Sequence, residues 1–168
     1  MTARLRRLEC RQMLPLKLDA AWDFFSRPDN LARITPADLG FQVTSSLPER
    51  MYAGMIVSYR VSPFGGITVP WVTEITHVRE PDFFVDEQRS GPYRFWHHQH
   101  HFRAVAGGVE MTDLVHYQLP FGCLGDLVAG ALVERRVAAI FAYRRRVLTE
   151  LFGPEGEGLS PGSAAGRW

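Results

Sequence analysis

Residues 93–119 read YRFWHHQHHFRAVAGGVEMTDLVHYQL, and this stretch decides the fold. Apolar and polar residues alternate on both sides of a Gly-rich turn, which predicts two antiparallel strands joined as a hairpin. If Ala106 and Gly107 form the tip, His100 lies directly opposite Asp113. A shift of one residue would mix the two faces of the hairpin, so its register is well specified.

The two faces of this hairpin differ in character. Across one face, Arg103 lies opposite Glu110 in a favourable charge pair. The other face is aromatic and apolar with a few polar groups, and it comprises Trp96, His98, His100, Phe102, Met111, Asp113, Val115 and Tyr117. We expect this second face to be the concave one, turned toward the interior of the protein.

Asp113 opposite His100 is unusual for a plain hydrophobic core. Burying a carboxylate costs several kcal/mol unless it is paired. An Asp–His pair would favour the charged carboxylate and would hold the imidazole in one tautomer. Two interpretations stay open: a polar anchor that orients an oxygen atom of a ligand, or a satisfied buried pair with nothing bound.

The four histidines at positions 97, 98, 100 and 101 raise the question of a metal site. Alternate residues of a strand point to opposite faces, so at most two of the four converge. His98 and His100 share a face at a spacing of about 7 Å, and Asp113 could be a third ligand. No other cysteine or histidine motif supports this interpretation, and we therefore expect neither a metal nor a cofactor.

The rest of the chain predicts an antiparallel sheet with three helices. Further strands are expected over 8–14, 55–61, 67–78 and 83–88. Two short helices should follow the first strand, one with Asp19 as its N-cap and one opening at Pro28. The hydrophobic period then changes to about three and a half, which predicts a long helix with Asp126 in its first turn and Gly153-Pro154 after its end.

The apolar stripe of this long helix should face the sheet. It comprises Leu127, Gly130, Val133, Val137, Ile140, Phe141, Arg144, Leu148 and Leu151. Arg144 is the polar exception, placed either to reach a carboxylate in the interior or to extend its charge to solvent. Tyr59 and Trp71 are expected on the inner wall, as ordinary core or as ligand contacts.

Composition and charge exclude several classes of protein. The chain has 168 residues, of which 46% are hydrophobic and 22% charged, so we expect one globular domain over 1–153 and a disordered tail over 154–168. A net charge of +1 argues against a nucleic-acid partner. Cys10 and Cys123 are too few for a disulfide framework. No apolar run reaches the roughly 20 residues of a membrane span, and no signal-peptide pattern is present, so we expect a cytoplasmic protein.

Several motifs together carry a family resemblance. They are Ala21-Trp22-Asp23-Phe24-Phe25-Ser26-Arg27-Pro28, Phe84-Val85-Asp86-Glu87-Gln88, Gly91-Pro92-Tyr93, Trp96-x-His98-x-His100-x-Phe102, Asp113-x-Val115-x-Tyr117, Pro120-Phe121-Gly122 and Phe141-x-Tyr143-Arg144. With them the chain resembles the SRPBCC superfamily of START lipid-transfer domains, birch pollen allergens and polyketide cyclases, and most closely its bacterial ligand-binding branch. The resemblance implies the α+β helix-grip fold, a curved antiparallel sheet around a long C-terminal helix. It also implies a cavity for hydrophobic molecules, but no single reaction.

Three functions are weighed on this basis. The first is binding or carriage of a small hydrophobic or amphipathic ligand, lipid-, sterol- or polyketide-like, by a monomer or weak homodimer. The ligand-binding residues would be Tyr59, Trp71, Trp96, His98, His100, Phe102, Asp113, Tyr117, Val137, Phe141 and Arg144. The second is a cyclase- or hydrolase-like enzyme in which His100, oriented by Asp113, acts as a general base. The third is a protein-interaction module, against which the polar outer faces argue.

Overall fold

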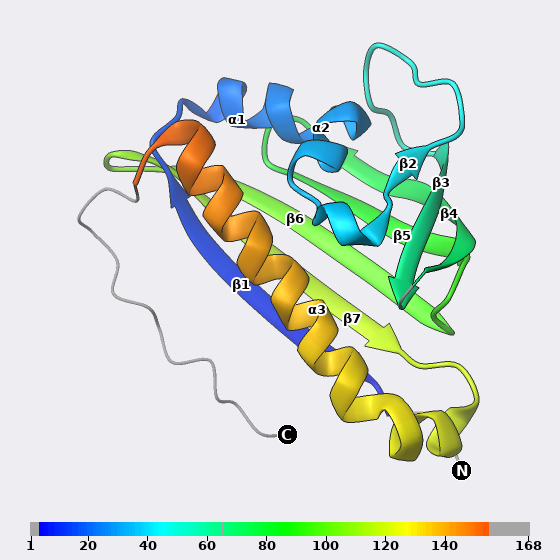
Figure 1. Ribbon diagram of the computed structural model, residues 1–168. Coiled ribbons are helices and arrows are strands. Elements are labelled where there is room, and N and C mark those ends of the chain that lie inside the picture. Colours follow the sequence, from blue (N-terminus) through cyan, green and yellow to red (C-terminus); the bar gives the residue numbers. More distant parts are fainter. Residues whose placement is uncertain (1–3, 65, 155–168) are drawn as a thin grey trace.

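A seven-stranded antiparallel sheet curves around a long C-terminal helix (Figure 1). The computed structural model describes residues 4–64 and 66–154, so the predicted tail lies outside the described residues from position 155 on. The elements in chain order are β1 (Arg6–Leu14), α1 (Leu18–Phe25), α2 (Pro28–Arg33), the 3-10 helix η1 (Ala37–Leu39), β2 (Gln42–Val43), β3 (Met55–Phe64), β4 (Ile67–Arg79), β5 (Phe83–Ser90), β6 (Phe95–Val105), β7 (Gly108–Gln118) and α3 (Gly122–Phe152). The predicted α+β helix-grip architecture is confirmed.

The order of strands across the sheet is β1-β7-β6-β5-β4-β3-β2. The chain runs from β2 to β7 by successive neighbours, and β1 closes the other edge by pairing with β7. This arrangement follows from the short turns between strands, which allow only antiparallel neighbours. Within the described residues, no helix is both long enough and apolar enough to span a bilayer.

The β6–β7 hairpin has the predicted register. His100 lies opposite Asp113, and the pairing continues without a break from Phe95 to Val105 on β6. Every residue of the predicted concave face is buried except Trp96, which is half-buried. On the outer face, Arg103 donates a hydrogen bond of 2.7 Å to Glu110, as the charge pairing predicted.

The hydrophobic core lies on the concave side of the sheet, in three clusters. The first joins α1 to β6, β7 and the end of α3, around Trp22 and Leu148. The second packs β7 against the middle of α3, and the third lies on β3 and β4, around Val57. Between them the helices and the sheet stay apart, and this gap positions the cavity described below.

Two details of the helix starts differ from the prediction. The N-cap of α1 is Lys17, which makes no capping hydrogen bond with its side chain, and Asp19 lies in the first turn. Helix α3 begins at Gly122, because Phe121 adopts the left-handed conformation and turns the chain directly from β7 into the helix. Asp126 therefore lies beyond the first turn, where its carboxylate pairs with the side chain of Arg6 instead of complementing the helix dipole.

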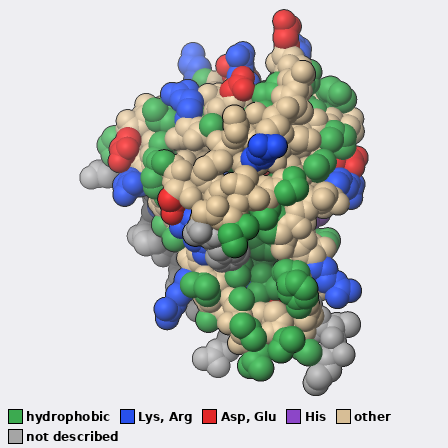
Figure 2. Space-filling model, turned by 45° about the vertical axis from the view of Figure 1, so that its right-hand side comes forward, with side chains coloured by type: hydrophobic (Ala, Val, Ile, Leu, Met, Phe, Trp, Pro, Cys, Tyr) green, Lys and Arg blue, Asp and Glu red, His purple; other side chains and the backbone are tan. Residues whose placement is uncertain are grey.

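The first turns of α3 carry an exposed apolar surface. Leu127 was expected in the buried stripe, yet 84% of it is exposed, and Leu151 at the other end is exposed as well. In Figure 1 the start of α3 extends past the ends of β1 and β7, so no strand lies beneath its first turns. The exposed large apolar residues here are Phe121, Leu124, Leu127, Val128 and Leu132. Figure 2 shows hydrophobic side chains gathered over this part of the molecule, so an exposed apolar surface lies on the helix, a feature that was not predicted from the sequence.

Candidate functional site

A cavity of about 190 Å³ lies between the concave face of the sheet and the helices α1, α2 and α3. Its walls are mainly apolar, and their aromatic residues are Phe24, Phe25, Phe41, Tyr59, Trp71, Phe84, Tyr93, Trp96 and Phe141. The exposed Arg27, at the junction of α1 and α2, also lines the cavity and marks a place where it reaches the surface. Such a mostly apolar hollow with a few polar groups is typical of small-molecule sites.

Eight of the eleven residues expected to bind a ligand line this cavity. They are Tyr59, Trp71, Trp96, His98, His100, Val137, Phe141 and Arg144. Phe102 does not line it, because its ring packs against Phe25 at 5.3 Å and Trp22 at 6.1 Å in the core. Tyr117 likewise packs in the cluster beneath α3, and Asp113 lies behind the two histidines.

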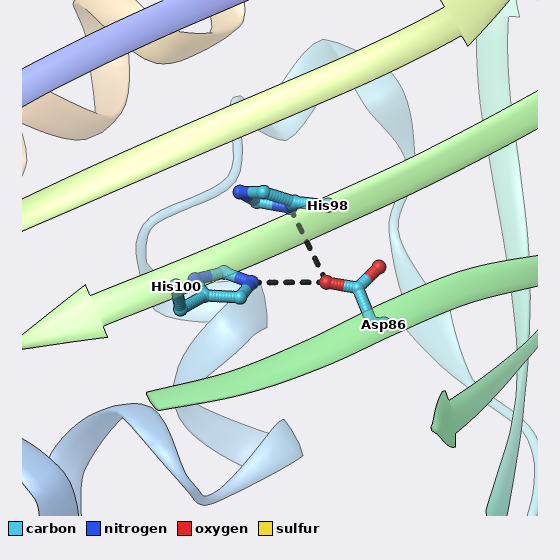
Figure 3. Close-up of side chains that lie close together, drawn as sticks. All are labelled: Asp86, His98 and His100. Carbon is cyan, nitrogen blue, oxygen red and sulfur yellow. Dashed lines mark hydrogen bonds and ion pairs between the residues drawn. The ribbon is translucent and has the colours of Figure 1, made fainter. Parts of the chain in front are cut away.

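Two histidines and Asp86 lie in the wall of the cavity, and Asp113 lies behind them. His98 and His100 lie on one face of β6 with their rings 3.8 Å apart between centroids. On one side of the rings, Oδ2 of Asp86 lies 3.3 Å from His98 Nδ1 and 2.9 Å from His100 Nε2 (Figure 3). On the other side, Oδ1 of Asp113 lies 3.0 Å from His98 Nε2 and 3.0 Å from His100 Nδ1. Each imidazole thus bridges two carboxylates.

Sequence reasoning found Asp113 but missed Asp86. Asp86 lies on β5 directly opposite His98, just as Asp113 on β7 lies opposite His100. The β6–β7 turn is short enough to fix its register from sequence, whereas the turn between β5 and β6 leaves several registers open. The available signal was the acidic residue in the middle of an otherwise half-buried strand, since a buried carboxylate needs a partner.

Arg144 adds a positive charge to this group from α3. It is only 6% exposed, its Nη1 lies 3.5 Å from Asp113 Oδ1, and its guanidinium lies 5.5 Å from the ring centre of Phe25 and 5.9 Å from that of Phe141. Among the described residues, its Nε has no hydrogen-bond partner. Of the two possibilities for Arg144, the structure shows the one that reaches an interior carboxylate. We call Asp86, His98, His100, Asp113 and Arg144 the polar centre.

Opposite charges overcome the cost of burial within the polar centre. Burial raises the pKa of Asp86, but the charge of His98 and hydrogen bonds from both histidines outweigh it and lower that pKa. The pKa of Asp113 is held well below its usual value, because Arg144 and the two histidines outweigh the effect of burial. Burial lowers the pKa of His98, but Asp86 and Asp113 outweigh it, and the net shift is upward. Both carboxylates are therefore ionised at neutral pH, and His98 favours its protonated form.

The reactivity of the two cysteine thiols tests whether the β1–β7 pairing beside Asp113 is buried as described. Cys10 lies opposite Asp113 in the β1–β7 pairing, and burial together with the charge of Asp113 raises the pKa of its thiol to about 11. Cys123 is exposed at the start of α3. Because the thiolate is the reactive form, iodoacetamide at neutral pH should modify Cys123 and leave Cys10 unmodified, as read by peptide mass spectrometry. In urea both should react; equal rates in the folded protein would contradict the β1–β7 arrangement.

Among known proteins, only solved structures resemble this chain, and they share its fold. No protein-family model matches the chain, and no curated protein matches it. Among solved structures, ginseng major latex-like protein 151 from Panax ginseng is 16% identical with a TM-score of 0.65, over 89% of this chain and 99% of that one. Protein Ms6760 from Mycobacterium smegmatis is 16% identical with a TM-score of 0.60, over 90% and 99%. Protein CV1439 from Chromobacterium violaceum is 12% identical with a TM-score of 0.65, over 88% and 97%. The chain thus shares the helix-grip fold of these proteins along nearly its whole described length.

Proposed function

We propose that the protein binds a small amphipathic molecule in the cavity between the sheet and α3. The observation that carries this proposal is Arg144, a buried cation at the wall of a largely apolar cavity, whose Nε has no hydrogen-bond partner among the described residues. A guanidinium has five donors in a fixed fork, and Nη1 of Arg144 lies 3.5 Å from Oδ1 of Asp113. The remaining donors suit an oxygen atom of a ligand whose apolar part rests on the aromatic walls.

The volume of the cavity limits the size of the ligand that it can hold. At about 190 Å³ the cavity is smaller than the roughly 300–1,000 Å³ of most sites for drug-sized molecules. This volume favours a ligand with one or two rings, or a short chain, over a sterol or a lipid with two acyl chains. A carboxylate or carbonyl oxygen on such a ligand would match the donors of Arg144.

Binding is favoured over cyclase- or hydrolase-like catalysis by the surroundings of His100. A general base needs an unpaired ring nitrogen within hydrogen-bond reach of the substrate. Nε2 of His100 is hydrogen-bonded to Asp86 at 2.9 Å, and its Nδ1 lies 3.0 Å from Oδ1 of Asp113, although this nitrogen makes no hydrogen bond among the described residues. His98 faces the same two carboxylates. The two histidines are therefore better suited to hold charge in the wall than to accept a proton from a substrate.

Naphthoate and naphthalene form a matched pair of probes for this proposal, because they differ only in the carboxylate. We expect naphthoate to bind the wild-type protein at least about tenfold more tightly, since a hydrogen bond to a charged group contributes about 1.5–3 kcal/mol. Titration calorimetry would measure both affinities. Arg144→Met should remove the difference between the two probes while retaining the binding of naphthalene.

Two substitutions on α3 test where the probes bind. Val137 lines the cavity, so Val137→Phe should fill part of it and abolish binding of both probes. Ala138 is the next residue and is exposed, so Ala138→Phe is a control that should bind as the wild type does. Circular dichroism would verify that both variants fold. Failure of both probes to bind, or wild-type affinity in Val137→Phe, would overturn the proposal.

A further inference from the structure

Three donor atoms from β5 and β6 converge at the wall of the cavity (Figure 3). They are a carboxylate oxygen of Asp86 and one ring nitrogen each of His98 and His100, and all lie within 4.8 Å of one another. We propose that these three side chains form a binding site for one divalent first-row transition-metal ion, such as Zn²⁺. The sequence predicted no metal because no other cysteine or histidine motif supported one. It offered Asp113 as the third ligand, whereas the structure places Asp86 of β5 in that position.

The distances around Asp86 fit a shared ion. Nitrogen and oxygen ligands lie about 2.0–2.2 Å from Zn²⁺, so two neighbouring ligands are roughly 2.8–3.6 Å apart for angles between octahedral and tetrahedral. Oδ2 of Asp86 lies 2.9 Å from His100 Nε2 and 3.3 Å from His98 Nδ1. Both separations fall within this range. The two ring nitrogens lie within 4.8 Å of each other, and rotation of the imidazoles would bring them to the same ion.

The opposite nitrogens of the two rings have the partner that metal-bound histidines need. A histidine that binds a metal through one nitrogen usually donates its other N–H to a carboxylate, which fixes the tautomer and the ring orientation. Asp113 accepts from His98 Nε2 at 3.0 Å, and it lies 3.0 Å from His100 Nδ1. Arg144 in turn holds Asp113 at 3.5 Å. Asp113 thus orients the imidazole of His98 by a hydrogen bond and lies beside that of His100 without one, and the remaining nitrogens of both rings face Asp86.

The donor set and the surroundings select the kind of ion. Imidazole suits Zn²⁺, Cu²⁺, Fe²⁺ and Ni²⁺, whereas Mg²⁺ and Ca²⁺ prefer oxygen ligands. Three protein ligands leave a coordination position open, as in catalytic rather than structural zinc sites. Asp86, His98 and His100 all line the cavity, so the open position would face the space where a small molecule can bind. The ion would displace the protons that the ring nitrogens share with Asp86.

Cobalt provides a direct test, because Co²⁺ replaces Zn²⁺ and its visible spectrum reports the ligands. The untagged full-length chain would be treated with a chelator, desalted and titrated with CoCl₂. We expect one Co²⁺ per chain, displaced by Zn²⁺ but not by Mg²⁺. Proton NMR of the cobalt form should show paramagnetically shifted ring signals from His98 and His100. Absence of stoichiometric binding, or displacement by Mg²⁺, would overturn the proposal.

Neighbouring histidines on β6 supply matched controls. Asp86→Asn and His100→Ala should bind Co²⁺ at least about 100-fold more weakly, whereas His97→Ala and His101→Ala, on the outer face of the same strand, should bind as the wild type does. Asp113→Asn keeps all three ligands and should weaken binding by about 10–100-fold, the usual effect of losing a carboxylate behind a ligating histidine. Wild-type affinity in Asp86→Asn would overturn the proposal. The paramagnetic shifts in the wild type test it even if a variant fails to fold.

Discussion

Replacing Asp113 with alanine should destabilise the protein by about 3–5 kcal/mol, the usual cost of breaking a buried ion pair from one side. Asp113 is 6% exposed and faces His98, His100 and Arg144. Its removal leaves the guanidinium of Arg144 buried without a carboxylate beside it, and it leaves two imidazoles paired on one side only. The free energy of unfolding would be measured by urea denaturation at neutral pH in the presence of a chelator.

Glu110 provides the control on the same strand. It accepts a hydrogen bond of 2.7 Å from Arg103, whose side chain is largely exposed on the outer face. The side chain of Glu110 is 11% exposed, but that of Arg103 is 72% exposed and stays hydrated without its partner. Because pairs with an exposed partner contribute about 0–1 kcal/mol, Glu110→Ala should cost clearly less than Asp113→Ala. A similar cost for both substitutions would mean that Asp113 does not neutralise the charges around it, and the account of the polar centre would then be wrong.

The hairpin was predictable in detail because its own residues determine it. The turn at Ala106 and Gly107 is short, and a one-residue slip would bury Arg103 and expose Phe102. Local turn geometry and the apolar pattern therefore agree on one register. The pairing of His100 with Asp113 follows from that register alone.

Asp86 could not be placed in the same way, because its position depends on contacts between distant parts of the chain. β5 pairs with β4 through two register irregularities, and its pairing with β6 extends only from Phe83 to Glu87. Neither the turn residues nor the alternation along β5 specifies that Asp86 lies opposite His98. The sequence therefore contains Asp86 in a predicted strand but does not indicate which side chains it contacts.

The long helix shows a different limit of sequence reasoning. Its apolar stripe correctly identifies the buried Val133, Val137 and Leu148, because periodicity reports which side of a helix is apolar. Periodicity does not report how far the sheet extends beneath the helix. Leu127 continues the same stripe, but it lies before the part of α3 that packs in the core, which begins near Ala129, and 84% of it is exposed.

Alanine at Gly108 should destabilise the protein by about 3 kcal/mol or more, through backbone strain and overpacking together. Gly108 has φ of +152°, and a Cβ there would overlap the carbonyl oxygen of Leu14 and stand 3.0 Å from its carbonyl carbon. Both groups belong to backbone at the seam where β1 pairs with β7, so neither can rotate away as a side chain would.

Gly107 separates the two contributions, because it has the strain without the contact. Its φ is +86°, and a Cβ there would meet nothing within 4 Å. Gly107→Ala should therefore cost only about 1–2 kcal/mol, the conformational penalty for a residue with a side chain in this region. Urea denaturation of both variants gives the difference. Equal costs would show that the end of β1 moves away from the added Cβ, whereas a larger cost at Gly108 would show that the backbone at Leu14 is held firmly against β7.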